Sequence, residues 1–204
     1  MISTIIEHII SATTQPLLFA IAFSYMTMYF YLFAFKKCET GKGLRYALSI
    51  WHRSFIQDRK FRILFLYILY ITVVIFRTVL NREGWDDPLD SVMAGLWLVM
   101  THPYVEGPIF NIQAIENIIM FVPFSFMGLL LQQYKRKNSQ KVLFTICGSF
   151  LFSLLIETVQ AIFKLGTFQL ADLLFNTMGG LFGGVLYWVG SKLKTLVLKY
   201  TVLK

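Results

Sequence analysis

Three polar residues interrupt an apolar stretch that reads FSLLIETVQAIF from Phe152 to Phe163. Ser153, Glu157 and Gln160 stand four and three residues apart, so a helix places them on one face. A carboxylate within so apolar a segment is costly in a bilayer, and such residues usually face protein or a wet cavity. This spacing fits a ligand site, a pair of acid and base groups, or hydrogen bonds between packed helices.

Polar or charged groups also occur where three other apolar segments meet the same side of the predicted membrane. These groups are Arg77, Asn117, Asp172 and Asn176, which complete the predicted polar cluster. We expect Arg77 to be the countercharge for Glu157 or Asp172, with the amides as hydrogen-bonding partners. The cluster is then either a polar pocket open to the outside or a structural network that fixes helix register.

Small residues in the last apolar segment predict close helix contacts. Gly179, Gly180, Gly183 and Gly184 form two overlapping small-xxx-small pairs, which allow neighbouring helices to approach. Pro123 lies about two turns into its own segment, where it removes a backbone N–H and is expected to kink the helix. A phosphate-binding loop is disfavoured, because it requires a strand before the glycines.

The elements that position these residues are membrane helices. The chain has 204 residues, a mean hydropathy of +0.62 and only 15% charged residues, whereas soluble domains have about 25%. A span needs roughly 20 mostly apolar residues. We therefore predict an all-α, polytopic transmembrane helical bundle with five spans, at Pro16–Phe35, Ile63–Leu80, Ile115–Gln132, Val142–Phe163 and Leu173–Val189.

The basic residues predict the orientation of these spans. Of the 19 Lys and Arg residues, 16 lie between spans one and two, between three and four, or after span five. The opposite segment, Asn81–Glu116, has six acidic residues and a single arginine. The positive-inside rule then puts the N-terminus outside and the C-terminus in the cytoplasm. The net charge of +8 is explained by topology and anionic headgroups, so we expect membrane lipids as partners and no nucleic acid.

Three further segments are assigned outside the spans. Met1–Gln15 is predicted to lie in the interface or to extend the first span. Ser91–Met100 is predicted to be an interfacial or re-entrant piece of the outer loop, and Tyr46–Ile56 a helix on the cytoplasmic surface. The chain is divided into a lead-in, first span and basic loop (1–62), a four-helix membrane domain (63–190) and a basic cytoplasmic tail (191–204).

No known catalytic or metal-binding motif is evident. The three histidines are isolated, and the two cysteines lie far apart in the sequence. We therefore predict no catalytic residue, no metal and no cofactor, which favours a non-enzymatic protein.

Three ordered motifs, ENIIMFVPFSFMG, SLLIETVQAIF and GTFQLADLLFNTMGGLFGG, resemble those of the VanZ-like family of bacterial membrane proteins, over about Ile63–Gly190. The family often has an arginine just before the Gly-Thr-Phe of the third motif, where this chain has Leu165 beside Lys164. The family pattern falls on Asn117, Phe121, Pro123, Ser153, Glu157, Gln160, Asp172, Asn176, Thr177, Gly179 and Gly180.

The resemblance implies a multi-pass protein of the bacterial plasma membrane. The namesake of the family confers low-level resistance to teicoplanin-type lipoglycopeptide antibiotics, so an effect on that susceptibility is expected. The outward pocket would engage an amphiphilic small molecule or a lipid-linked wall intermediate. The alternative is a membrane enzyme that acts on a lipid-linked cell-envelope substrate, with Glu157 and Asp172 as acid and base. A transporter is disfavoured unless the protein dimerises, because the five spans contain no inverted repeat.

Overall fold

The computed structural model describes residues 2–36, 38, 43–80, 89, 92–102, 105–132 and 138–202. Two π-helical turns, η1 and η2, continue helices α1 and α3 without a break. The elements in chain order are α1 (Ile2–Phe30), η1 (Tyr31–Phe35), α2 (Leu44–Gln57), α3 (Arg59–Ile75), η2 (Phe76–Leu80), β1 (Val99–His102), β2 (Val105–Phe110), α4 (Ile112–Leu131), α5 (Asn138–Phe163) and α6 (Leu170–Val202).

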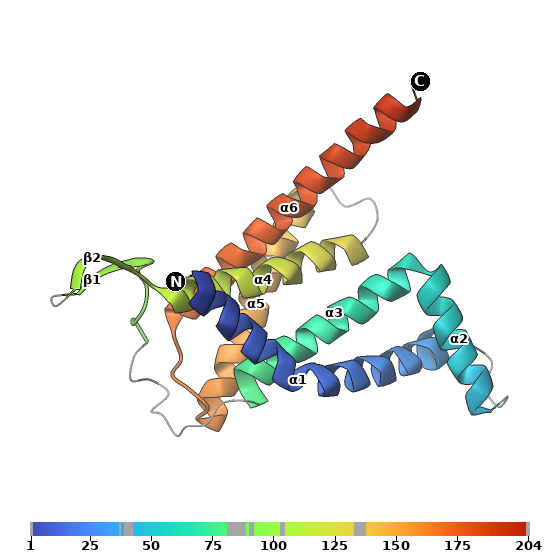
Figure 1. Ribbon diagram of the computed structural model, residues 1–204, viewed down its shortest axis with the longest axis horizontal. Helices are drawn as coiled ribbons and strands as arrows, with labels where there is room; N and C mark the ends of the chain where they lie inside the picture. Colours follow the sequence, from blue (N-terminus) through green and yellow to red (C-terminus); the bar gives the residue numbers. More distant parts are fainter. Residues whose placement is uncertain are drawn as a thin grey trace.

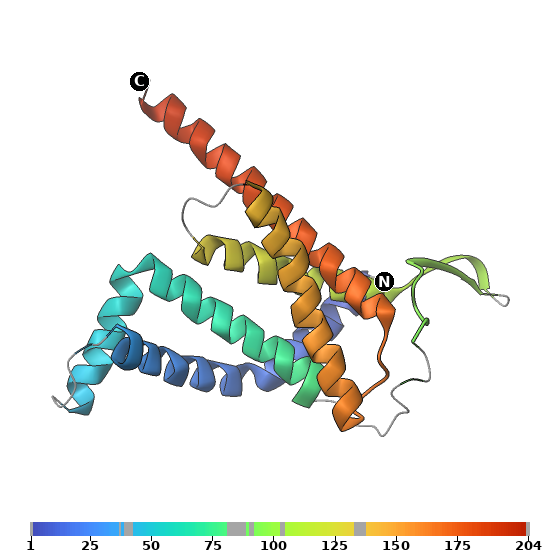
Figure 2. The same ribbon diagram turned by 180° about the vertical axis from the view of Figure 1, so that it is seen from behind.

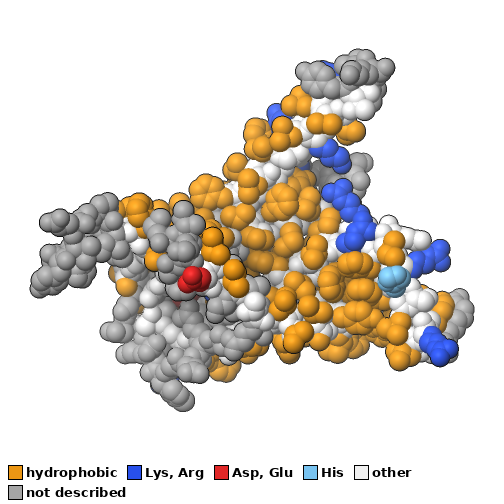
Figure 3. All heavy atoms as spheres, viewed as in Figure 1, with side chains coloured by type: hydrophobic (Ala, Val, Ile, Leu, Met, Phe, Trp, Pro, Cys, Tyr) orange, Lys and Arg blue, Asp and Glu red, His pale blue; other side chains and the backbone are white. Residues whose placement is uncertain are grey.

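Five helices of the described chain are long and apolar enough to cross a membrane, which confirms the predicted number of spans. Hydrophobic side chains cover the middle of the molecule, and Lys and Arg gather toward one end of it (Figure 3). We call this the basic end. The opposite end, where α3 and α5 end and α4 and α6 begin, is called the acidic end. The apolar segments are Pro16–Phe35, Arg59–Leu80, Ile112–Leu131, Gln140–Phe163 and Leu170–Lys199.

Helix α6 is much longer than the predicted fifth span. It does not end near Val189 but continues to Val202, beyond the ends of α4 and α5 (Figures 1 and 2). The segment from Ser191 to Val202 contains neither glycine nor proline, so nothing in it interrupts the backbone hydrogen bonds. Most of the predicted basic tail is therefore helical.

The N-terminal half is held by aromatic side chains. Residues before Pro16 extend the first span as part of α1, which changes direction along its length (Figure 1). The predicted surface helix is present as α2, and its Trp51 stacks on Phe55 with ring centroids 5.2 Å apart. Trp51 also meets the edge of Phe61, which is 1% exposed beside the end of α1.

Glycines dominate the contacts of α6 with α4 and α5. One pair faces backbone carbonyl groups of α4, and the other faces side chains of α5, so the two pairs serve different neighbours. A Cβ added to Gly179 or Gly183 would overlap a carbonyl oxygen of α4. The opposed residues are Gly179 and Ile118, Gly183 and Val122, Gly180 and Ser149, and Gly184 and Thr145.

A β-hairpin occupies part of the segment between η2 and α4, and the sequence did not predict it. Strands β1 and β2 pair antiparallel and extend from the acidic end (Figure 1). The described part of the predicted interfacial segment is a turn at 92–95, followed by a short loop into β1. Asn111 attaches this loop to the bundle, because its side chain donates to Gly95 O (3.0 Å) and accepts from the Ala114 N–H (3.1 Å) in the first turn of α4.

Candidate functional site

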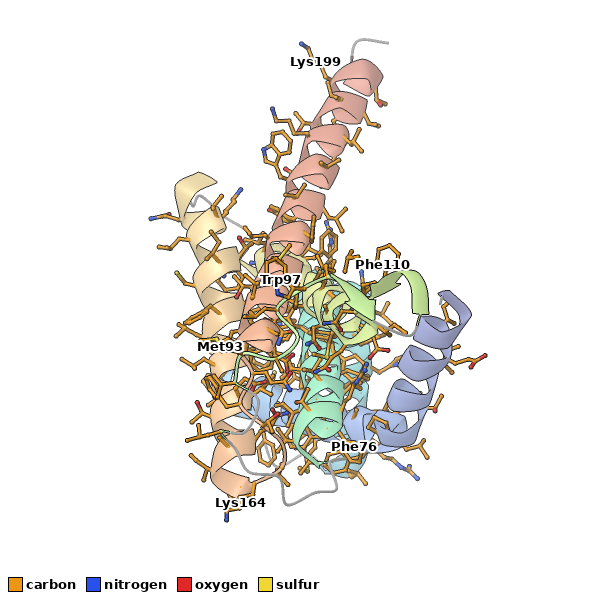
Figure 4. The ribbon with its side chains drawn as sticks, turned by 90° about the vertical axis from the view of Figure 1, so that its left-hand side faces the viewer. Phe76, Met93, Trp97, Phe110, Lys164 and Lys199 are labelled. Carbon is orange, nitrogen blue, oxygen red and sulfur yellow. The ribbon has the colours of Figure 1, made fainter. Side chains whose placement is uncertain are left out.

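The polar residues predicted to form a cluster lie where α3 and α5 end and where α4 and α6 begin. Figure 4 shows this end of the molecule, with Lys164 at the foot of α5 and Met93 and Trp97 on the loop before β1. The exposed fractions of the buried members are 0% for Ser153, 1% for Glu157 and Gln160, 4% for Asn176 and 8% for Asp172. Groups this polar are kept buried in proteins only with hydrogen-bonding partners or for function.

Asp172 joins α6 to α4. It lies in the first turn of α6, where a carboxylate is stabilised by the positive end of the helix dipole. Its Oδ1 accepts a hydrogen bond from Asn117 Nδ2 at 2.7 Å and a longer one from Gln113 Nε2 at 3.4 Å. The charge-assisted bond to Asn117 therefore fixes the register of the two helices.

Glu157 holds the connection between α5 and α6. Its Oε2 accepts the backbone N–H of Gln169 at 3.0 Å, just before α6 begins. The same connection starts with Lys164 at a φ of 51°, and the N–H of Leu165 bonds to Gln160 O at 2.8 Å. This is the left-handed end that usually carries glycine. A lysine in the left-handed conformation and a buried carboxylate thus shape one turn.

Gln160 joins α5 to the π-helical turn η2. Its Nε2 donates to Thr78 O at 2.6 Å, and Thr78 lies in the last turn of that helix. Gln160 Oε1 is buried and accepts no hydrogen bond from the described residues. One side of this amide is therefore used for structure, and the other remains an unpaired acceptor.

The side-chain amide of Asn176 likewise has a paired nitrogen and an unpaired oxygen. Its Nδ2 donates to Ser153 Oγ at 2.8 Å and so joins α6 to α5. Its Oδ1 is buried and has no donor within the described part of the chain. Gln160 and Asn176 thus present two unpaired acceptor oxygens within one polar cluster.

Arg77 does not pair with either predicted partner in the described structure. Its guanidinium forms a salt bridge of 2.7 Å with Glu116 Oε2 at the start of α4. Arg77 lies in η2, and a π-helical turn inserts an extra residue that changes which side chains face the neighbouring helix. The expectation that Arg77 faces Glu157 or Asp172 is corrected accordingly.

Several members of the cluster were missed by sequence reasoning. Ser149 Oγ lies 3.0 Å from Ser125 Oγ, and these buried hydroxyls join α5 to α4. The signal for Ser149 was its position four residues before Ser153, on the same helical face. Glu116 stands beside Asn117 at the outer end of its span but was not assigned to the cluster. Gln113 and Gln169 gave no comparable signal.

The cluster is rich in hydrogen-bond acceptors. It contains the carboxylates of Glu116, Glu157 and Asp172, each of which has a partner, and the two unpaired amide oxygens. Such a set suits hydroxyl, amino or amide N–H groups of a ligand. Within the described chain, no group of three or more His, Cys, Asp or Glu residues could hold a metal ion.

The fold and the cluster define a multi-pass membrane protein with a buried polar site between its helices. The chain belongs to the VanZ/LLP1 family, whose model matches residues 17–193, and this confirms the family predicted from the three motifs. The matched range also includes the first span and the basic segment after it.

A related protein of known name supports this assignment. The chain is 35% identical over 82 residues to Protein VanZ of Enterococcus faecium, which covers 39% of this chain and 47% of that protein. The match thus spans about half the length of the relative. No solved structure matches the chain.

Proposed function

We propose that the protein is a non-enzymatic envelope protein of the bacterial plasma membrane that changes susceptibility to teicoplanin-type lipoglycopeptide antibiotics. Membership of the VanZ/LLP1 family and the distant likeness to Protein VanZ support this class of function. The buried polar cluster is consistent with engagement of an amphiphile, whose polar head would bind among the side chains of the cluster.

The observation that carries this proposal is the pair of unpaired acceptors, Gln160 Oε1 and Asn176 Oδ1. A buried acceptor without a donor costs about 1–3 kcal/mol, so packing alone does not explain why two are kept. Hydroxyl or amino groups of a ligand could each donate to one of these oxygens. A leucine in place of Gln160 or Asn176 would keep the helix apolar and would leave no buried acceptor without a donor.

The surroundings of the cluster also suit an amphiphile. The positive-inside rule puts the acidic end at the outer face of the membrane. Met93 and Trp97 on the neighbouring loop are 68% and 75% exposed, and aromatic residues favour the membrane–water interface. The acyl tail would lie against such apolar surface while the head reaches the cluster.

Deletion of the gene in its own bacterium tests the proposal. We expect sensitivity to a lipidated glycopeptide to increase several-fold more than sensitivity to an unlipidated one, and the intact gene to restore it. Equal changes for both antibiotics would contradict the role in amphiphile binding. Conversion of a lipid-linked envelope substrate by the purified protein would replace the proposal by the enzyme alternative.

A further inference from the structure

A second candidate site lies toward the basic end, on the part of α5 and α6 remote from Glu157 and Asp172. A groove of about 940 Å³ runs between the first turns of α5 and the second half of α6. Figure 2 shows the start of α5 lying beside α6 in this region. The groove is lined by Lys141, Thr145, Trp188 and Lys192, with Leu129 of α4 at its side.

The contacts between α5 and α6 show how the two lysines of the groove are placed. Gly184 of α6 faces Thr145 of α5. One turn further along both helices, Lys141 is therefore level with Trp188, and Lys192 lies one more turn, about 6 Å, beyond it along α6. Both ammonium groups are thus expected within one headgroup layer.

Each lysine is held over an aromatic ring. Lys141 Nζ is 5.5 Å from the centroid of Tyr187, and Lys192 Nζ is 5.0 Å from that of Trp188. Within the described residues, neither lysine has an acidic partner. The rings orient the two cations but do not neutralise them, so the groove keeps a local charge of about +2.

The remaining walls of the groove are apolar. Leu181, Val185 and Trp188 of α6 line it, and the side chains of Val185 and Trp188 are 55% and 52% exposed. Gly184 forms part of the wall, and a Cβ there would lie 2.7 Å from Thr145 Cγ2. Lysines at the headgroup level with an apolar channel beside them match the two parts of a phospholipid.

We infer that this groove binds an anionic phospholipid from the leaflet at the basic end, with its phosphate between Lys141 and Lys192 and an acyl chain along α6. Basic pockets between membrane helices are a known way to recognise anionic headgroups. A second copy of the chain is a poorer occupant, because its helix would have to bury two cations without counterions.

Native mass spectrometry of the full chain, released from nanodiscs, tests the inference. The nanodiscs contain phosphatidylglycerol and phosphatidylcholine with matched acyl chains. The test variant is Lys141→Gln with Lys192→Gln. Its control is Lys194→Gln with Lys199→Gln, which removes the same charge from α6 outside the groove. Lys141→Arg with Lys192→Arg keeps the charge and controls for a loss of folding.

The wild-type protein is expected to retain phosphatidylglycerol in preference to phosphatidylcholine. An anionic surface contributes about 5-fold in affinity per lysine, so the glutamine pair in the groove should reduce this preference by up to about 30-fold. The control pair and the arginine pair should keep most of it. The inference is overturned by absence of a headgroup preference, by an equal loss in the control pair, or by a protein dimer that occupies the groove in place of lipid.

Discussion

The two halves of this molecule are built on different contacts. In the half formed by α1, α2 and α3, large rings fill the space between helices, and Trp51 alone contacts Tyr25, Phe55, Phe61 and Phe65. In the half formed by α4, α5 and α6, rings also stack between α4 and α5, as Phe124 does on Phe152. Helix α6, however, joins this half through glycines that bring the backbones together and through polar side chains that bond across the gaps.

The difference explains where a site can form. Rings adapt to one another over a range of tilts, so they hold helices together without fixing single atoms. A glycine contact permits only one close approach of two backbones, and a hydrogen bond depends strongly on distance and angle. The half that contains α6 can therefore position unpaired acceptors such as Gln160 Oε1, and the aromatic half supports it.

The largest expected effect comes from filling a glycine contact. Gly179→Leu should leave no folded protein in a size-exclusion profile of detergent extracts, because even the new Cβ overlaps the carbonyl oxygen of Ile118. Gly190→Leu is the matched control, since nothing lies within 4 Å of a Cβ at that position. Similar amounts of folded protein for both variants would contradict the close approach of α6 to α4.

The aromatic half should lose stability more gradually. Phe61→Ala should reduce the free energy of unfolding by about 3 kcal/mol, because it empties space between α1, α2 and α3. Phe35→Ala should have little effect, since that ring is 79% exposed. Thermal unfolding in detergent compares the two variants, and equal melting temperatures would show that the ring cluster does not hold these helices.

The hydrogen bond from Gln169 to Glu157 permits a finer test in the polar half. Glu157→Leu should destabilise the protein by about 1–3 kcal/mol, because it leaves the Gln169 N–H without its acceptor. Glu157→Gln keeps an acceptor oxygen and should cost less than about 1 kcal/mol. If thermal unfolding shows the same loss for both variants, this hydrogen bond does not stabilise the turn.

The smallest effect is expected at Asp58, which caps α3. A hydrogen bond from Lys36 at 2.7 Å lowers the pKa of Asp58 below its ordinary value of 3.8, and the N–H groups of Phe61 and Lys60 act in the same direction. Because the pKa is lower in the folded state, the stabilisation is present above about pH 3.8 and is lost as the pH falls through the folded pKa.

Asp58→Asn isolates the charge, because asparagine caps helices about as well as aspartate. The pair is partly exposed, so solvent limits the loss to under about 1 kcal/mol at neutral pH and low salt. Unfolding curves of wild type and variant should converge in acid below the folded pKa. A difference that persists there would assign the effect to the cap rather than to the charge.

The sequence was informative wherever the signal is local. Length and hydropathy located five spans, and the spacing of Ser153, Glu157 and Gln160 predicted a shared face. Helix ends were less predictable, because hydropathy marks where a span ends and not where its helix ends, and α6 continues past Val189 to Val202. The β-hairpin was missed because its residues carry no clear alternation.

Pairing between helices could not be predicted in the same way. The partner of Arg77 depends on the π-helical turn η2, which directs its side chain toward Glu116. No residue pattern in the sequence predicts this turn. The unpaired oxygens of Gln160 and Asn176 could not be predicted either. They follow from the hydrogen bonds that the two amide N–H groups donate to Thr78 and Ser153, which lie on other helices. Tertiary packing therefore determines which side chains pair between helices.

The most direct test of the central claim separates the role of the cluster in function from its role in folding. A deletion strain is complemented with Glu157→Gln or Asp172→Asn, and susceptibility to a lipidated glycopeptide is measured together with the amount of protein in the membrane. We predict that both variants reach normal membrane levels and fail to restore wild-type susceptibility. Full restoration by both variants at those levels would contradict the claim and leave the cluster a structural network.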